Sequence, residues 1–229
     1  SSDLNKKLMV GFVLRFHPAY SNIKRAIEEG DIGKFLYAYA RRIGSLNSAR
    51  RLGTRVTVNE YIAIHDIDQI LWYNSVPVKS VSTKAVYGKV YEEIGTYDLS
   101  VTSLQFEDDT FATIETGWNL PSVTTNWLRP NKWQPAADIR MDILGTEGRL
   151  WMGGVPTNLI GLVEDGLRFP ELMNWPDVNG RTVGALKTEL EHFIDCILYD
   201  RMPLITEDQV LTSLKILLAA EQSIKEKKE

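Results

Sequence analysis

One short segment of the sequence places groups that exchange protons within a strongly apolar background. Tyr61, His65, Asp68 and Trp72 follow one another at spacings of four, three and four residues, so they share one face of an α-helix. The residues between them are mainly apolar, which predicts a buried helix over 61–72. A buried polar group without a partner costs about 1–3 kcal/mol. We therefore expect these groups either to satisfy one another or to face a wet pocket in which the imidazole does acid–base chemistry.

Other candidate binding side chains lie further along the chain. Arg41, Arg42 and Arg55 flank a polar loop and can bind hydroxyls or a carboxylate through forked donors, although surface solvation explains at least two of them. Trp118 and Asn119 end a predicted strand, where an indole can stack on a sugar ring and an amide can bind a hydroxyl. A tryptophan in a strand is more often part of the core, so both interpretations stay open. No metal-ligand spacing is present, and we predict no metal.

Composition and charge argue against several classes of protein. The 229 residues carry a net charge of -4, which disfavours nucleic acid or an anionic membrane as a partner. No apolar run reaches the roughly 18 residues of a membrane-spanning helix. Cys196 is the only cysteine, so an internal disulfide is excluded, and its apolar helical surroundings predict a buried, inert thiol. The cytoplasm is the compartment that suits such a chain.

Hydrophobic periodicity predicts the elements that must hold these side chains. A buried strand is expected over 8–14 and a helix over 19–29. A strand over 34–42 and an arginine-rich loop then precede the helix over 61–72. Two amphipathic helices close the chain. The remaining strand-like runs lie at 78–87, 97–106, 111–120, 139–144, 149–152, 158–163 and 167–169, with a long proline-bearing loop over 121–135 and closing helices over 186–198 and from 206 onward.

This order predicts an α+β fold. Consecutive strands joined by short turns pair antiparallel, and segregated helices cover one face, which gives a large, mostly antiparallel, open-faced sheet. Several residues expected on the second face are apolar, so we expect that face to pack against another subunit in a homodimer or homotetramer. These residues are Phe35, Tyr37, Tyr39, Leu99 and Val101.

Four segments, which together cover almost the whole chain, resemble the Gfo/Idh/MocA family, the relatives of glucose–fructose oxidoreductase and inositol dehydrogenase. They are VGFVLRFHP (10–18) with its following helix and GDIG (30–33), the helix carrying HDID (65–68), LGTEGRL (144–150), and the closing helices around RMP (201–203) and AAEQS (219–223). The resemblance implies a fold similar to the C-terminal domain of glyceraldehyde-3-phosphate dehydrogenase.

The resemblance also implies that part of the family's enzyme lies outside this sequence. Family members begin with a nucleotide-binding domain, but this chain has neither a Gly-x-Gly-x-x-Gly turn nor the family's Glu-Lys-Pro motif. Residues 1–18 then correspond to a segment that crosses between domains, and 19–229 to the substrate and oligomerisation domain. NAD or NADP would serve the parent enzyme, whereas this fragment alone is expected neither to bind the cofactor tightly nor to turn over.

Roles for single residues follow from the same resemblance. His65 matches a histidine that hydrogen-bonds the substrate hydroxyl whose carbon gives up hydride, and imidazole suits this role because it titrates near neutrality. Family members usually carry an aspartate one helical turn before this histidine, and Tyr61 stands at that position here. Tyr61 or Asp68 would then orient the imidazole ring of His65. Arg15 and His17 are candidates for contact with the nicotinamide or substrate, with packing an equal alternative for the arginine. The substrate-binding set is then Tyr61, Asp68, Arg42, Trp118 and Asn119.

These observations predict an NAD(P)-dependent dehydrogenase or reductase acting on a sugar, cyclitol or related polyol. Two alternatives stay open. The first is a non-catalytic sugar-binding or regulatory relative, which the missing carboxylate before His65 favours slightly. The second is a mainly structural oligomerisation domain. In either alternative, His65 is a buried histidine satisfied by Asp68 or by a backbone carbonyl.

Overall fold

The computed structural model of this protein describes residues 6–120, 138–153, 161–163, 166–168, 172 and 174–226. One sheet of six strands dominates this part of the chain, in the order β2-β3-β4-β1-β5-β6. Alternating apolar and polar residues build most of these strands, close to their predicted bounds. The strands are β1 (Phe35–Ser45), β2 (Val78–Val86), β3 (Leu99–Phe106), β4 (Phe111–Leu120), β5 (Asp138–Gly145) and β6 (Arg149–Gly153).

The sheet is mostly antiparallel, as predicted. Neighbours in sequence pair antiparallel where the connections are short, in β2–β3–β4 and in β5–β6. The exception is β1, which runs parallel to β4 with Ala38 beside Ala112, while it pairs antiparallel with β5. Parallel pairing is possible there because a long crossover with helices and two strands joins β1 to β4.

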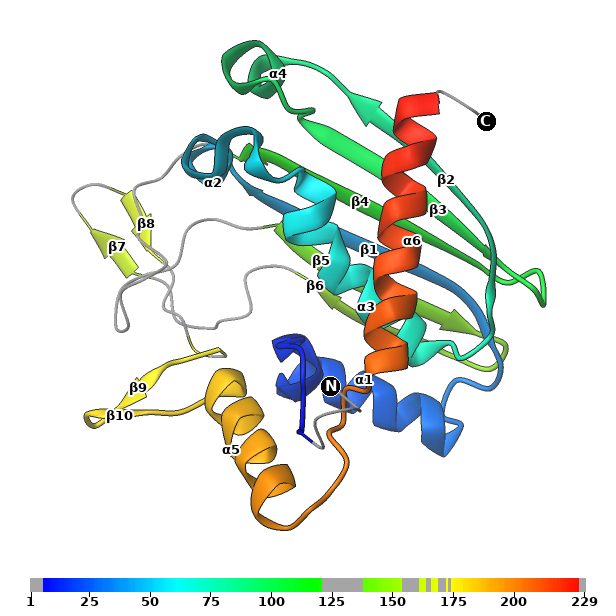
Figure 1. Cartoon of the computed structure of the whole chain (residues 1–229), viewed down its shortest axis with the longest axis vertical. Helices are drawn as coiled ribbons and strands as arrows, with labels where there is room; N and C mark the ends of the chain where they lie inside the picture. Colours follow the sequence, from blue (N-terminus) through cyan, green and yellow to red (C-terminus); the bar gives the residue numbers. More distant parts are fainter. Residues whose placement is uncertain are drawn as a thin grey trace.

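Helices cover one face of the sheet. Figure 1 shows α6 and α3 lying across that face, with α1 and α5 at the end of the molecule that also holds residues 6–12. The core lies between the sheet and α3 and α6, where Ala38 and Ala40 let Ile67 and Leu217 approach closely. The helices are α1 (Pro18–Glu29), α2 (Leu46–Leu52), α3 (Ile64–Tyr73), α4 (Lys89–Ile94), α5 (Ala185–Leu198) and α6 (Glu207–Glu226).

The predicted strand over 8–14 is wrong. Residues 6–12 have no regular secondary structure, and a 3₁₀ turn (η2) follows over Val13–Phe16. Local hydrogen bonds, such as those from Phe12 N to Val10 O and from Arg15 N to Phe12 O, replace a ladder. A strand needs a neighbouring strand for its backbone groups. The described sheet offers none here, so a short apolar run alone does not produce a strand.

Several smaller elements complete the described chain. The arginine-rich loop contains α2 and a 3₁₀ turn at Gly53–Arg55, and neither element was predicted. Short hairpins pair β7 (Gly161–Val163) with β8 (Gly166–Arg168) and β9 (Asp177–Val178) with β10 (Arg181–Thr182). The loop over 121–135 and the predicted strand residues 158–160 and 169 lie outside the described residues. Within the described part, no helix is long and apolar enough to cross a membrane.

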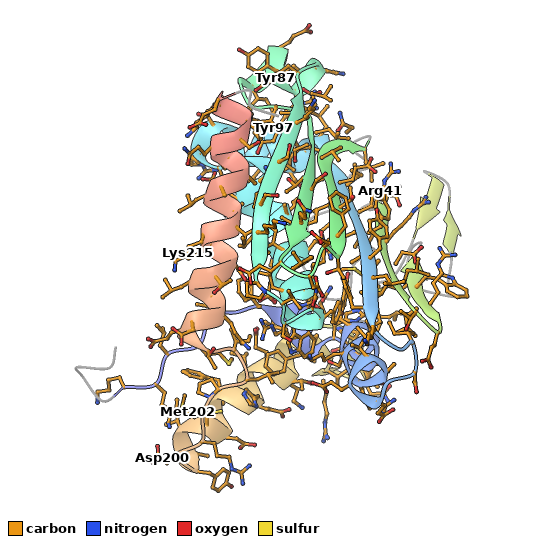
Figure 2. All side chains as sticks on the ribbon, turned by 90° about the vertical axis from the view of Figure 1, so that its right-hand side faces the viewer. Arg41, Tyr87, Tyr97, Asp200, Met202 and Lys215 are labelled. Atoms are coloured by element: carbon orange, nitrogen blue, oxygen red, sulfur yellow. The ribbon has the colours of Figure 1, made fainter. Side chains whose placement is uncertain are left out.

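The second face of the sheet carries a mixture of aromatic and charged side chains. Tyr39 donates a hydrogen bond of 2.6 Å to Glu115, and Arg41 pairs with Asp138 at 3.0 Å. Figure 2 shows Arg41 on the side of the sheet opposite α6. Phe111 remains 39% exposed on β4. The sheet is therefore open on this face, as the sequence predicts.

Candidate functional site

The helix that carries His65 begins with an unusually wide turn. A π-helical turn over Asn59–Ala63 runs directly into α3, so the helix predicted over 61–72 is present but has π geometry in its first residues. Thr57 and Glu60 cap its start reciprocally, with the Glu60 carboxylate accepting from Thr57 N at 2.7 Å and Thr57 Oγ1 from Glu60 N at 3.2 Å. Glu221 of α6 also accepts from Thr57 Oγ1 at 2.9 Å. Such π turns are frequent at functional sites.

The predicted polar stripe separates into a buried ion pair and a pocket wall. Asp68 is fully buried and accepts two hydrogen bonds from Arg15, at 3.0 Å from Nε and 2.7 Å from Nη2. Arg15 also donates to Gln209 at 2.8 Å and lies 5.3 Å from the centre of the Trp72 ring. The described hydrogen bonds of Asp68 come from Arg15 and Gln69 and none comes from His65, whose Nδ1 is buried without a hydrogen-bond partner. The expectation that Asp68 orients or satisfies His65 is therefore wrong.

A small pocket brings His65 together with Arg42 and Tyr61. Its volume of about 210 Å³ is below the range for drug-sized ligands, roughly 300–1,000 Å³, so it suits a ligand the size of a single sugar ring. The other lining residues are mostly apolar, with a few polar groups from α2 and from the segment before α5. These residues are Val13, Leu14, Ile43, Gly44, Ser48, Ile62, Ile139, Asn174 and Trp175.

The surroundings of His65 keep its imidazole neutral. Burial, assisted by the nearby positive charge of Arg42, lowers the pKa of His65 to about 4, and the opposing effect of Asp66 is smaller. A neutral imidazole can accept a proton throughout the physiological range. Phe12 lies edge-on to the ring at a centroid distance of 6.5 Å. The site therefore holds a neutral imidazole beside an apolar wall, and any increase in its basicity must come from a bound ligand or from a closed site.

Arg42 is held in place by a buried carboxylate. Its Nη2 lies 2.8 Å and its Nε 3.0 Å from the two oxygens of Asp66, and Nη2 also donates to Tyr20 Oη at 2.7 Å. Asp66 is almost fully buried, so its charge is matched mainly by Arg42. The pKa of Arg42 is raised by this carboxylate despite the cost of burial. The guanidinium is thus fixed at the pocket, where it can donate to a ligand oxygen.

Trp118 and Asn119 do not form the predicted sugar-binding pair. Trp118 is fully buried, and the ring of Tyr61 stacks on it at 5.9 Å with an interplanar angle of 21°. A buried indole offers no face to a sugar, so Trp118 belongs to the core. Asn119 is exposed and donates to Asp98 at 3.4 Å. Neither residue lines the pocket, and Tyr61 presents the accessible ring instead.

The two residues predicted to contact the cofactor have structural partners in this chain. Arg15 is engaged with Asp68 as described above. His17 is buried, its Nδ1 accepts from Ala19 N at 3.2 Å at the start of α1, and its ring lies edge-on to Tyr20. These contacts favour packing roles, and cofactor contact in a larger protein stays a prediction. Among the described residues, no group of three or more His, Cys, Asp or Glu side chains could hold a metal.

Apart from Arg42, sequence reasoning missed the polar and aromatic pocket residues that come from outside the predicted helix. Ser48 lies on α2, within the stretch interpreted as a polar loop, and Asn174 and Trp175 precede α5. Only the aromatic side chain of Trp175 and the helix-forming run at 46–52 gave any signal. The tertiary fold, not local spacing, brings these residues to His65.

Comparison with known sequences identifies the family. Residues 20–151, more than half of the chain, match the family of GFO/IDH/MocA C-terminal domains. Over 221 residues the chain is 26% identical to scyllo-inositol 2-dehydrogenase (NAD(+)) of Bacillus subtilis (strain 168). That match covers 94% of this chain and 60% of the relative, so the chain spans less than two thirds of its length.

Solved structures show the same fold. Scyllo-inositol dehydrogenase from Lactobacillus casei, crystallised with NAD(H) and scyllo-inositol, has a TM-score of 0.76 at 22% identity. Myo-inositol 2-dehydrogenase from Lactobacillus plantarum has a TM-score of 0.77, also at 22% identity. Each comparison covers 99% of this chain and 65% of the solved chain. The fold therefore agrees with the match of residues 20–151 to the family model. The chain belongs to the GFO/IDH/MocA C-terminal domain family.

Proposed function

We propose that this chain is the substrate-side domain of an NAD(P)-dependent dehydrogenase or reductase that acts on a sugar, a cyclitol or a related polyol. The observation that carries the proposal is a neutral His65 in a pocket of single-ring size, next to the fixed guanidinium of Arg42. The names of the relatives, inositol dehydrogenases that use NAD, support the class of substrate and cofactor.

The pocket supplies the proton chemistry of such a reaction. When an alcohol is oxidised, a proton leaves its oxygen as hydride leaves its carbon, and His65 would accept that proton. Arg42 would stabilise the negative charge that develops on the oxygen, because its guanidinium is held in place before the reaction begins. In the reverse direction the protonated imidazole would return the proton to a carbonyl oxygen.

The cofactor would be held by residues outside this chain. A bound nicotinamide cofactor accepts or donates the hydride, but the sequence has no glycine-rich turn to bind its pyrophosphate, and the described contacts of Arg15 and His17 are internal. The residues present thus do not fit a complete cofactor site. We expect this chain alone neither to bind NAD(P) tightly nor to turn over.

An exposed apolar face supports a second domain at α5. Glu189 and Cys196 point inward from this helix, whereas Leu190, Ile194 and Ile197 are 52–56% exposed. Exposed apolar patches of this kind mark contact surfaces. Residues 6–12, which have a strand-like sequence without a strand, lie at the same end of the molecule (Figure 1). We therefore propose that 1–18 cross to a nucleotide-binding domain seated against α5, with 19–229 as the substrate domain.

The open face of the sheet is the proposed contact between subunits. It carries exposed Val101 and Phe111 together with the half-buried rings of Tyr37 and Tyr39. Tyr37 stacks on Phe111 at 6.3 Å across the parallel pair of strands, which gives a flat aromatic surface. Such a surface suits a homodimer or homotetramer formed through the sheet.

A second candidate is a sugar-binding relative without catalysis. The observation that favours it is the unpartnered Nδ1 of His65, because catalytic imidazoles are usually oriented by a hydrogen bond to this nitrogen. Tyr61 occupies the position of the family's carboxylate, and its hydroxyl accepts a hydrogen bond from Arg51 at 3.0 Å. In this alternative the pocket binds a polyol but moves no proton.

Turnover by the parent polypeptide separates the two candidates. NADH and NADPH fluorescence would be followed with a panel of sugars, inositols and their keto forms, for the parent and for His65→Ala. We expect turnover that falls by roughly 10²–10⁴-fold in His65→Ala, the range for general acid–base catalysis. His192→Ala, which removes a histidine of α5 whose Nε2 accepts from Leu204 N at 2.9 Å, reports the cost of losing a structural histidine outside the pocket. Cofactor binding without turnover on any compound would favour the non-catalytic relative.

A further inference from the structure

We propose that the polyol carries a carboxylate, and that Arg51 binds this group at the mouth of the pocket. The substrate would then be a sugar acid and not a neutral sugar. This inference rests on the proposed function, because it takes for granted that a polyol occupies the pocket beside His65. It adds the charge of the substrate and the residue that recognises it.

Arg51 is positioned at the pocket by its own helix and by Tyr61. Ser48 of α2 lines the pocket, and Arg51 follows it by one helical turn, on the same side of the helix. Its Nη2 donates to Tyr61 Oη at 3.0 Å, and its guanidinium carbon lies 5.9 Å from the centre of the Tyr61 ring. Tyr61 lines the pocket and is fixed by its stacking on Trp118. The guanidinium is therefore held at the exposed end of a pocket wall.

The charge of Arg51 is not matched by a carboxylate within the described residues. The partner it has is the neutral hydroxyl of Tyr61, whereas Arg42 is paired with Asp66 at 2.8 Å and Arg50 with Glu93 at 2.9 Å. No described residue that lines the pocket is acidic. The positive charge of Arg51 is therefore uncompensated beside the pocket, which favours an anion over a neutral ligand.

The geometry of the guanidinium suits a carboxylate. Arginine presents parallel N–H donors that match the two oxygens of a carboxylate, and only Nη2 of Arg51 is engaged with Tyr61 in the described structure. A hydroxyl in the same place would accept one hydrogen bond without charge complementarity. A sugar acid can thus place its hydroxyls against Arg42 and His65 and its carboxylate against Arg51.

Neighbouring arginines of one helix provide a matched test. D-Glucuronate and D-glucose differ in a single carboxylate, and their binding to the 229-residue chain would be measured by tryptophan fluorescence, because Trp175 lines the pocket. Arg51→Gln removes the proposed carboxylate partner. Arg50→Gln makes the same change of charge one residue earlier, where the side chain is paired with Glu93. Circular dichroism and thermal unfolding would establish that both variants fold.

We expect glucuronate to bind at least about 5-fold more tightly than glucose at low ionic strength, and this preference to shrink in about 0.5 M NaCl. Arg51→Gln should abolish the preference, Tyr61→Phe should reduce it by freeing Arg51, and Arg50→Gln should preserve it. Equal affinities, an equal loss in both arginine variants, or no binding of glucuronate would overturn the proposal. Turnover of neutral polyols without preference for acids would overturn this inference alone. An Arg51-dependent preference without any NAD(P) turnover would instead count against the proposed function.

Discussion

Burial of His65 should make the stability of the chain depend on pH in a way that one substitution removes. The pKa of His65 is lowered from the usual 6.5 to about 4 in the folded protein, mainly by desolvation. Between these two values the unfolded chain binds a proton that the folded chain does not, so the free energy of unfolding falls as the pH falls from 6.5 towards 4. Above pH 6.5 both states are neutral and the effect disappears.

The size of the effect follows from the difference between the two pKa values. A difference of about 2.5 units corresponds to roughly 3 kcal/mol once the pH lies below both values, at about 1.4 kcal/mol per unit. At pH 5 about 2 kcal/mol of this would already be lost. Because the ring is partly exposed at the pocket, we expect about 1–2 kcal/mol between pH 7 and pH 5.

Urea unfolding at pH 7, 6 and 5 would measure this dependence for the chain and for His65→Gln. The variant should lose about 1–2 kcal/mol less than the wild type between pH 7 and pH 5, because glutamine does not titrate. His192→Gln would report what the loss of a histidine outside the pocket does. Parallel pH dependences for the wild type and His65→Gln would refute a desolvated imidazole with a lowered pKa.

Three further predictions concern stability. Arg15→Ala should destabilise the chain by about 3–5 kcal/mol in denaturant unfolding, because it leaves Asp68 buried without its partner. The double variant Arg15→Met with Asp68→Leu should cost much less, because it removes both charges. Equal losses of unfolding free energy in the single and the double variant would contradict this prediction. Gly145→Ala should lower the melting temperature markedly, because its Cβ would lie 2.1 Å from the carbonyl oxygen of Ile32, and an unchanged melting temperature would contradict that contact. Burial raises the pKa of Glu189 to about 7, so its contribution to stability is lost as the pH rises from 4.5 through 7. Glu189→Gln should therefore stabilise the chain at pH 8 by about 1–3 kcal/mol and little at pH 5, and stabilisation independent of pH would exclude this cause.

The sheet was predictable from the sequence because its strands alternate between a core face and an open face. Runs such as 99–106 and 111–120 encode both the strand and the direction of each side chain. Burial of Cys196, which is 1% exposed, likewise follows from the helical pattern around it. The segment over 8–14 is instead a continuous apolar run, and it has no neighbouring strand among the described residues, so its prediction failed.

Predictions within the site failed where they depended on partners distant in sequence. No residue close to Asp68 in the sequence indicates that Arg15, 53 residues away, would form an ion pair with it. Periodicity placed Trp118 in a strand but did not show that its ring faces the core and supports Tyr61. Arg42 and His65 do meet at the pocket, and both were chosen for their chemistry. Residue types thus indicate what a site can do, whereas the fold decides which of them meet.

The position of a bound polyol tests the central claim most directly. A crystal structure of the parent polypeptide with its cofactor and a substrate would show whether a hydroxyl lies within about 2.6–3.2 Å of a ring nitrogen of His65. We expect this contact, with the polyol between Arg42, Tyr61 and Trp175. A substrate bound outside this pocket, or one whose reacting hydroxyl does not reach His65, would contradict the account.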